Sequence, residues 1–336
     1  MAEKIVSPGV FTRENDLSFL PAGVGAIGAA IVGPTVKGPA GIPTMVTSYA
    51  EYVEKFGDTF QSGSDYYQYL TSHTAERYLQ FGGALTVVRV AGTGVSVATA
   101  SANTSSAATS VSGKVFTLHT LAHGSVLNNA GSTVGENQQL SNGTKDNLRW
   151  EVTGKNTTTG TFNLLLRRGN DTSNNKVILE QFNGVNLDPN SPNYISKAIG
   201  DSFDTTAGTA SDPYIQANGS YVRKSSYIRV EVHKQTVNYL DENGSIRISA
   251  ASASLPANGS GSLHGQFGGG SDGATVAGAK LFYDTITDLN TQGLDANDLS
   301  NTNGGVKYAE ALQLLANQDF YDINMIIVPG VNQKDH

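Results

Sequence analysis

The sequence predicts a fold of the α+β or α/β class: an α/β platform layer, interrupted by a large β-rich insertion and preceded by an extended N-terminal arm. Three observations lead to this expectation. Helix and strand patterns alternate as far as Val90, helical patterns then disappear over a long stretch, and both return near the end of the chain. We therefore expect an arm at residues 1–22, platform parts at 23–93 and 273–336, and the insertion at 94–272.

The first platform part is expected to begin with a buried strand. Residues 26–33 form a short apolar run bounded by Gly and Pro, and a second strand is expected at 43–46. A short helix follows, because Ser48 and Glu51 have the spacing of a capping box and Gly57 stands just past the helix end.

A second helix is expected to open at Asp65 and to stop at Gly82-Gly83. Its tyrosines recur near helical spacing, which favours core packing over an exposed recognition stripe. The segment ALTVVRV at 84–90 is an evident strand. Strand, helix, helix and strand in this order predict a βαβ unit of an α/β layer.

The insertion is predicted to be a series of β-hairpins, with Asn-Gly pairs at several turns. Trp150 lies inside an alternating strand and is expected in the core. A Ser/Thr/Ala stretch at 101–112 and a Gly/Ser-rich stretch at 252–273 are expected to be linkers or exposed loops. The expected strands are 114–121, 148–152, 161–168, 176–182, 227–234 and 245–249.

The second platform part is expected to resume the α/β layer. A helix is predicted at 306–318, with Tyr308, Leu312 and Leu315 on one face, and a strand is predicted at 323–328.

The composition excludes several classes of protein. The 336 residues include 22 Lys and Arg against 29 Asp and Glu, a net charge of -7, so nucleic acid is not an expected partner. Cysteine is absent, which removes disulfides, thiol nucleophiles and cysteine-based metal sites. The longest apolar run, Val24–Gly33, is shorter than the ~20 residues of a membrane helix, and no secretory pattern opens the chain, so no membrane insertion is expected.

No pattern in the chain indicates a cofactor site. Gly23, Gly25 and Gly28 match G-x-G-x-x-G, but a dinucleotide site needs a strand before the glycines and a helix after them. Here a strand follows, so close packing where the arm enters that strand explains these glycines better. The sequence also has no G-x-x-x-x-G-K-[ST] phosphate loop, and no cofactor is expected.

Metal sites and catalysis are not expected either. His119 and His123 are four residues apart in a predicted strand, without the carboxylates that would complete a metal site. Residues 188–193, DPNSPN, lack the central Gly and the final Glu of a calcium loop, which favours a proline-rich turn. No pair of carboxylates has a spacing typical of acid and base catalysis, so the chain is not expected to be an enzyme.

Four stretches resemble contractile phage tail sheath proteins of the myovirus type. The first, at 7–57, begins with SPGVFTREND and ends with EYVEKFG. The block EQFNGVNLDPNSPNYISKAIGDSF at 180–203 and the turn GGGSDGA at 268–274 are the second and third. The fourth, ALQLLANQDFYDINMIIVPG at 311–330, resembles the helix and strand that precede the family's C-terminal domain. The matches occur in family order.

The resemblance implies a structural subunit that polymerises around a tail tube as stacked hexameric rings or a six-start helix. Contraction of this polymer would drive the tube through the host envelope for genome ejection. Copies of itself, the tail tube protein, the baseplate and the tail terminator are the implied partners, in a virion tail assembled in the host cytoplasm. The usual C-terminal domain, which carries tube contacts, is expected to be missing, and the insertion would face outward.

The same resemblance implies an arm that is exchanged between neighbouring copies. Its apolar residues have no core of their own, and an extended segment can add a strand to a sheet edge. The expected arm contacts are Ile5, Val6, Val10 and Phe11. The expected structural turn residues are Leu187, Asp188, Pro189, Asn190, Ser191, Pro192, Tyr194, Gly269, Gly270, Asp272 and Gly273.

Two other hypotheses stay open at the level of sequence. A virion or cell-surface adhesin would bind glycans through the β-rich part, using aromatic residues such as Trp150, Tyr214, Tyr221 and Tyr227. An α/β enzyme with a nucleotide cofactor rests only on the glycine motif.

Overall fold

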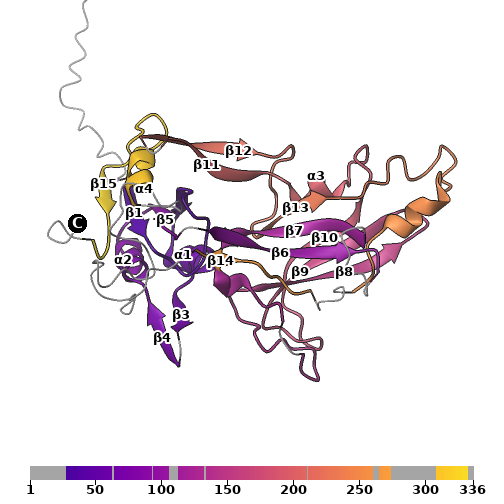
Figure 1. Cartoon of the computed structure of the whole chain (residues 1–336), viewed down its shortest axis with the longest axis horizontal. Coiled ribbons are helices and arrows are strands. Elements are labelled where there is room, and N and C mark those ends of the chain that lie inside the picture. The colour runs from indigo at the N-terminus through magenta and orange to yellow at the C-terminus, as the bar shows by residue number, and fades with distance from the viewer. Residues whose placement is uncertain are drawn as a thin grey trace, which may run out of the picture.

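The computed structural model has the mixed helices and strands of an α+β fold. It describes residues 28–62, 64–92, 94–105, 113–131, 134–209, 211–259, 265–273 and 308–331. A sheet flanked by helices lies at one end of the long axis, and a β-rich part extends to the other end (Figure 1). The expected arm contacts Ile5, Val6, Val10 and Phe11 lie outside the described residues.

The helix-flanked sheet has the strand order β15-β1-β5-β2. β1 (Ala29–Gly33) and β5 (Leu85–Arg89) are parallel neighbours, which confirms the predicted βαβ unit. β2 (Thr44–Val46) pairs antiparallel with β5. β15 (Met325–Ile327) pairs in parallel with β1, so strands from the beginning and the end of the chain share one sheet.

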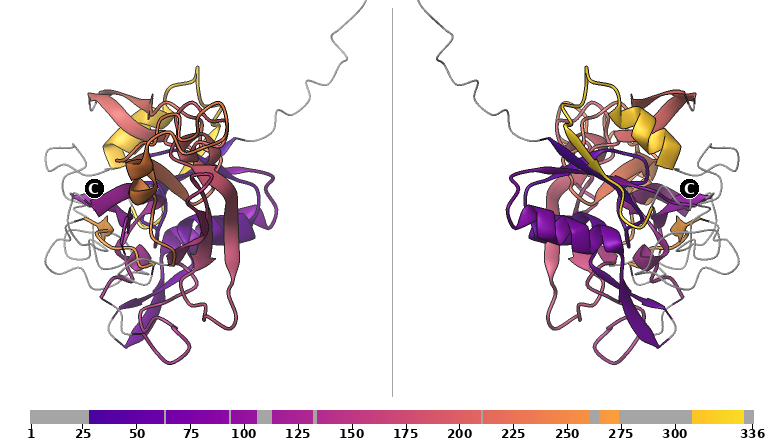
Figure 2. Two further views of the ribbon diagram at one scale, coloured as in Figure 1. Left: turned by 90° about the vertical axis from the view of Figure 1, so that its right-hand side faces the viewer. Right: turned by 90° about the vertical axis from the view of Figure 1, so that its left-hand side faces the viewer.

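Helices cover both faces of this sheet. α1 (Tyr49–Phe56) and α2 (Leu70–Leu79) pack on one face, and α4 (Tyr308–Leu315) packs on the other (Figure 2). Side chains alternate along a strand, so Ile31 points to α1 and α2 whereas Val32 points to α4. Burial on both faces explains the uninterrupted apolar run of β1.

The start of α1 confirms the predicted helix signal. The Ser48 hydroxyl accepts the backbone N–H of Glu51 at 3.2 Å, and the Glu51 carboxylate accepts the N–H of Thr47 at 2.8 Å. A hydrogen bond from Lys55 and the bond from Thr47 lower the pKa of Glu51 to about 2. Gly57 ends the helix at φ 77°, a conformation that favours glycine.

The predicted face of α4 is also confirmed. Tyr308 and Leu315 are buried in one cluster with β1 and β5, and Leu312 packs against that cluster. This helix therefore covers the sheet with the residues that its periodicity indicated.

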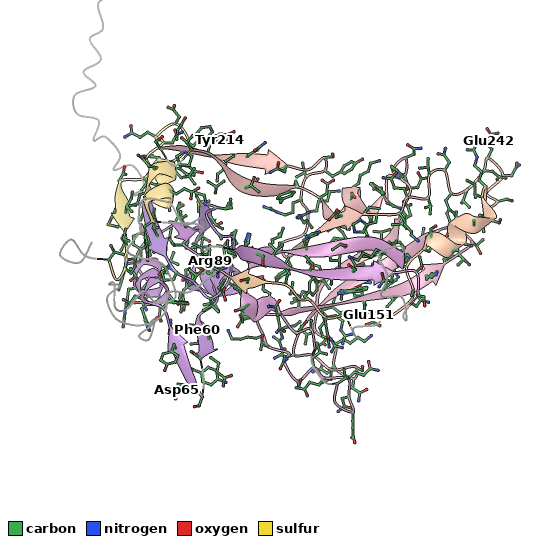
Figure 3. The ribbon with its side chains drawn as sticks, in the orientation of Figure 1. Phe60, Asp65, Arg89, Glu151, Tyr214 and Glu242 are labelled. Carbon is green, nitrogen blue, oxygen red and sulfur yellow. The ribbon has the colours of Figure 1, made fainter. Side chains whose placement is uncertain are left out.

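The segment after α1 corrects one prediction. A helix was expected from Asp65, but β3 (Thr59–Ser62) and β4 (Asp65–Gln68) form a hairpin there, and α2 begins only after it. The Phe60 and Tyr67 rings lie 6.1 Å apart across the two strands, so aromatic pairing outweighs the helical spacing of the tyrosines. Asp65 lies at the tip of this projecting hairpin (Figure 3).

The β-rich part is a sandwich of two antiparallel sheets, with strand orders β13-β7-β6-β14 and β10-β9-β8. Five of the six predicted strands are confirmed as β7, β8, β9, β10 and β13. The bounds are β6 (Val95–Asn103), β7 (Lys114–His123), β8 (Leu148–Asn156), β9 (Thr161–Arg168), β10 (Ile178–Asn186), β13 (Ile228–Val232) and β14 (Ser271–Asp272).

One hydrophobic core fills the space between these two sheets. Phe116 on β7 stacks on Phe162 of β9 at 5.9 Å between ring centroids. Trp150 is 3% exposed beside them, which confirms its predicted place in the core. Two short helices, α3 (Ile195–Ile199) and the 3₁₀ helix η2 (Ser125–Leu127), add apolar residues to the same cluster.

Three predictions in the insertion are wrong in whole or in part. The segment 245–249 is not a strand: Ile246 makes only an isolated bridge, and the 3₁₀ helix η3 (Ser249–Ser254) follows, since Ile248 is 58% exposed with no core to cover. The stretch 252–273 is not an exposed loop throughout, because Leu255 and Phe267 are fully buried. β6 also extends into the stretch expected to be a linker at 101–112.

A second hairpin connects the sandwich to the sheet. β11 (Phe203–Thr209) and β12 (Asp212–Asn218) reach from the sandwich toward the helix-flanked sheet, where β12 lies against α4 (Figure 1). The Thr206 hydroxyl donates to the Gly41 carbonyl at 3.2 Å. This hairpin was not predicted from the sequence because its residues carry little apolar alternation.

Candidate functional site: a polar junction and open sheet edges

The sheet and the sandwich have separate hydrophobic cores, and polar contacts join the two. The sandwich residues form one buried cluster, and the two faces of the sheet form two others. We call the polar contacts between them the junction and define it by five residues and the groups they bond: Lys37, Arg89, His123, Asp146 and Asp272.

Arg89 is the centre of the junction. It ends β5, and its side chain is only 2% exposed between the sheet and the sandwich (Figure 3). The guanidinium donates to the carbonyls of Gly38 at 3.0 Å and His123 at 2.7 Å, and it forms an ion pair with Asp272 at 2.6 Å. A buried charge is tolerated only with such partners, so this side chain ties three chain segments together.

Asp272 holds the other side of the ion pair. Its second oxygen accepts hydrogen bonds from the N–H and the hydroxyl of Ser125, and its carbonyl accepts the N–H of Gly92. Gly273 has φ 88°, and a Cβ there would collide with the Gly92 backbone. The predicted turn of Gly269, Gly270, Asp272 and Gly273 therefore lies at the junction.

His123 is held neutral inside the junction. Its backbone N–H donates to the Gly38 carbonyl at 3.0 Å, and its ring Nδ1 accepts the backbone N–H of Ala40 at 3.3 Å. Burial, together with the charge of Arg89, lowers the pKa of His123 to about 4. At neutral pH the ring can accept a hydrogen bond, which a protonated ring cannot do.

A second set of charges crosses the junction beside the first. Lys37, which is 8% exposed, forms an ion pair with Asp146 of the sandwich at 2.9 Å. Lys145 bridges Asp146 at 3.4 Å and Asp58 at 2.8 Å, and Asp58 stands just after α1. The Tyr227 hydroxyl bonds Glu54 of α1 as well.

The junction occupies the place where open α/β sheets bind ligands, outside the carboxyl ends of parallel strands. Here Arg89, the backbone of Gly38 and the carboxylate of Asp272 fill that place and bond one another. Gly28 is the described member of the glycine motif, and a Cβ there would collide with the Asp322 backbone, so close packing explains it. The other glycines of the motif, at 23 and 25, lie outside the described residues.

Within the described part of the chain, no three His, Asp or Glu side chains gather in a way that would hold a metal ion. His119 bonds Glu231 at 2.9 Å, and His123 belongs to the junction. None of the helices that the structure describes is long and apolar enough to cross a membrane.

The predicted turn block at 187–194 is held by its own polar groups. Asp188 accepts the N–H of Asn190 at 3.0 Å through its carboxylate and the N–H of Ser191 through its carbonyl. The ammonium of Lys197 donates to the carbonyls of Pro189 at 2.6 Å and Ser191 at 3.1 Å. The Lys197 ammonium, a cation of the chain itself, therefore satisfies both carbonyls. Leu187 and Tyr194 are buried on either side of the turn.

The sheet has two edges that differ in how they are covered. Among the residues described, β15 pairs with β1 on one side only, and its Met325 and Ile326 are 39% and 43% exposed. β2 forms the opposite edge with Met45 62% exposed, but the Lys55 ammonium donates to the Met45 carbonyl at 3.2 Å. A lysine on an edge discourages strand addition, so β15 is the more open edge.

The aromatic residues of the adhesin hypothesis do not form one exposed platform. Trp150 is buried in the core, and Tyr221 and Tyr227 are partly buried against it. Tyr214 is 51% exposed and lies on the β11–β12 hairpin (Figure 3).

Comparisons with known proteins find similarity at the level of structures alone. No protein-family model matches the chain, and no curated protein matches it. A sheath tail protein from Desulfitobacterium hafniense is 10% identical with a TM-score of 0.39, over 97% of this chain and 46% of that one. A sheath tail protein from Listeria innocua is 12% identical with a TM-score of 0.33, over 74% of this chain and 34% of that one. The chain spans less than half the length of either structure.

Arg89 and Lys37 were not singled out from the sequence, and His123 was considered only as a metal ligand. One feature of the sequence could have indicated Arg89. It is a charged residue directly after the apolar run of a predicted buried strand, and a buried charge requires a partner. The partners, Asp272 and Asp146, are more than a hundred residues away in sequence, and nothing local identifies them.

Proposed function

We propose that this chain is a structural subunit of a tail sheath, which polymerises with copies of itself. The sequence blocks in sheath order support the proposal, and so does a sheet with an open edge. The observation that carries it is the outer edge of β15, where Met325 and Ile326 are exposed and no described strand pairs with the backbone. An edge of this kind is a template for a strand from another chain.

The strand would come from the arm of a neighbouring copy. Ile5, Val6, Val10 and Phe11 supply apolar side chains on an otherwise polar segment. Backbone hydrogen bonds to the edge would supply the affinity, and alternate side chains would fit beside Met325 and Ile326. Copies linked through such arms stay connected when their bodies move.

The finer parts of the proposal follow from the resemblance. The polymer would surround a tail tube as stacked hexameric rings, contract through rearranged contacts between copies, and drive the tube through the host envelope for genome ejection. The energy would come from the contacts, so no catalysis is needed. Baseplate and tail terminator would cap the polymer in the virion tail, which would assemble in the host cytoplasm. Residues 94–272 would face outward as an insertion.

Negative-stain electron microscopy of the full-length product tests the proposal. Long striated tubes are expected, and deletion of residues 1–22 is expected to abolish them without changing the circular dichroism spectrum. The proposal fails if the product stays monomeric over a range of salt concentrations.

A matched pair of substitutions tests the edge itself. Ile326→Lys is expected to prevent tubes, whereas Ile248→Lys, on an exposed 3₁₀ turn of the sandwich, is expected to leave them intact. Tubes from both variants would exclude the β15 edge as the contact.

A further inference from the structure

The sandwich contains a cavity that is separate from the junction and from the β15 edge. The cavity has a volume of about 580 Å³ and lies between the 187–194 turn block, β13 and the base of the β11–β12 hairpin. Its lining includes Tyr194, Asp201, Phe203, Tyr221, Arg229 and Glu231.

Arg229 is an available donor in this cavity. Its guanidinium lies over the Phe203 ring, 4.1 Å from the centroid, which fixes its position. It makes no hydrogen bond or ion pair with any residue that the structure describes, although burial lowers its pKa. A partly desolvated guanidinium of this kind is a fixed fork that matches a carboxylate.

The acids of the cavity are already engaged. Asp201 accepts the N–H groups of Ser220 at 2.8 Å and Tyr221 at 2.7 Å. Glu231 bonds His119 at 2.9 Å. They help to keep Arg229 charged from a distance, but they leave its N–H groups free for an incoming anion.

The walls of the cavity suit an aromatic group beside that anion. The Tyr194 and Tyr221 rings meet edge to face at 5.9 Å, and the Lys197 ammonium lies 5.9 Å from the Tyr221 centroid. Arg223 and Lys224 follow the lining residue Tyr221 in sequence and are exposed, and the Arg223 guanidinium lies 4.0 Å from the Asp204 carboxylate. An acidic segment with an aromatic residue therefore fits this cavity.

The chain itself offers such a segment. Phe320 is 79% exposed between Asp319 and Asp322, and neither carboxylate has a hydrogen bond or ion pair within the described structure. Residues 273–336 hold eight Asp and Glu against three Lys, whereas residues 94–272 hold thirteen of each sign. The loop therefore belongs to an acidic part of the chain, whereas the charges of residues 94–272 balance, so the attraction rests on the Arg229 guanidinium itself.

We propose that the Arg229 cavity of one copy receives the Asp319–Phe320 loop of a second copy of this chain. The inference rests on the proposed function, because it names a contact between copies. Loop and cavity are different surfaces, so each copy offers both, and the contact repeats from copy to copy. Repetition of this kind builds rings or helices, as a sheath requires.

Charge reversal tests the proposal on the full-length chain. Arg229→Asp and Asp319→Arg are each expected to weaken assembly at least tenfold, measured as the concentration at which polymers appear in sedimentation. The double variant Arg229→Asp with Asp319→Arg is expected to restore assembly. Arg223→Asp, at the exposed cation near the cavity, is the matched control and is expected to have a smaller effect.

Cross-linking gives an independent measurement, since the chain has no cysteine. Ser220→Cys and Phe320→Cys chains, mixed with a short bismaleimide, are expected to form a covalent dimer that neither chain forms alone. Ser220→Cys mixed with Tyr66→Cys is the control.

The outcomes separate this proposal from the sheath proposal. Polymers that resist both charge reversals and give no Ser220–Phe320 cross-link overturn the contact but leave the sheath function standing. A selective cross-link without any polymer supports the contact and contradicts the sheath. Circular dichroism shows whether the Arg229→Asp chain is folded. If it is unfolded, Arg229→Gln is used in its place.

Discussion

The sandwich and the helix-flanked sheet bury their apolar residues in different ways. The sandwich closes on itself: among the described residues, its cluster holds twenty-three buried residues from two facing sheets and from the helices and loops that connect them, including Phe116, Trp150 and Phe162. The sheet has clusters of seven and eight described residues on its two faces, and no described strand pairs with the outer edge of β15. Among the described residues, the sandwich buries its apolar side chains between its own sheets, whereas Met325 and Ile326 at the edge of the helix-flanked sheet are exposed.

The junction also keeps the cores of the two regions separate. An apolar interface would merge the two cores, but Arg89, Lys37 and their carboxylate partners join them through charges and backbone carbonyls. Such contacts fix one orientation and lose their stability when a single partner is removed. We therefore expect substitutions in the sandwich core, in the sheet core and at the polar junction to have different effects.

The largest effect is expected from the sandwich core. Phe162→Ala should reduce the free energy of unfolding by about 4 kcal/mol, because it removes a fully buried ring that stacks on Phe116. Leu85→Ala in the sheet should cost about 3 kcal/mol. Hydrogen exchange should rise mainly in the region that carries each substitution. An equal rise in both regions for either variant would mean that the cores are not separate.

The junction comes next. Arg89→Ala should reduce the free energy of unfolding by about 3 kcal/mol, because Asp272 and two carbonyls lose a buried donor. Calorimetry should then resolve two transitions in place of one. Arg77→Ala, at an exposed arginine on α2, should change almost nothing. If the Arg89 variant behaves like this control, the junction does not couple the two regions.

Acid should loosen the junction before it affects the cores. The pKa of His123 is lowered from 6.5 to about 4 in the folded protein, so the unfolded chain binds a proton first as the pH falls. Stability that is present at neutral pH is therefore lost as the pH falls below 6.5, by about 2 kcal/mol at pH 4.5.

The control for this pH dependence is His123→Gln, whose amide oxygen can still accept the N–H of Ala40. Urea unfolding should show a flatter dependence between pH 7 and pH 4.5 for this variant. The same slope in both proteins would assign the pH dependence to other groups, such as His119.

The smallest effect is expected at the cap of α1. Ser48→Ala should cost about 1 kcal/mol, because the first turn loses the acceptor for the Glu51 N–H. Faster amide exchange should be confined to α1. Faster exchange in the sandwich as well would show that the sheet and the sandwich are more tightly coupled than the separate cores suggest.

Patterns of local origin could be predicted from the sequence. The capping box of α1, the apolar run of β1 and the alternation in β7 to β9 depend on neighbours in the chain, and the structure confirms them. The hairpin at Thr59–Gln68 could not be predicted this way, because Phe60 and Tyr67 must meet across two strands. β6 was missed because its buried side chains, Ala98, Ala100 and Ala102, carry little hydrophobic signal.

The candidate site was less accessible to prediction than the fold. The turn at Gly269–Gly273 was identified, but its partner Arg89 lies about 180 residues earlier, and no spacing rule connects the two. The Arg229 cavity likewise depends on three elements that meet only in the folded chain.

The most direct test of the central claim is hydrogen exchange at Met325–Ile327 in assembled full-length chains, compared with chains that lack residues 1–22. If an arm from a neighbouring copy adds a strand to the β15 edge, these amides should be protected in the assembled state and should exchange faster without the arm. Equal exchange in the two proteins, with polymers still visible for the shortened chain, would contradict the account.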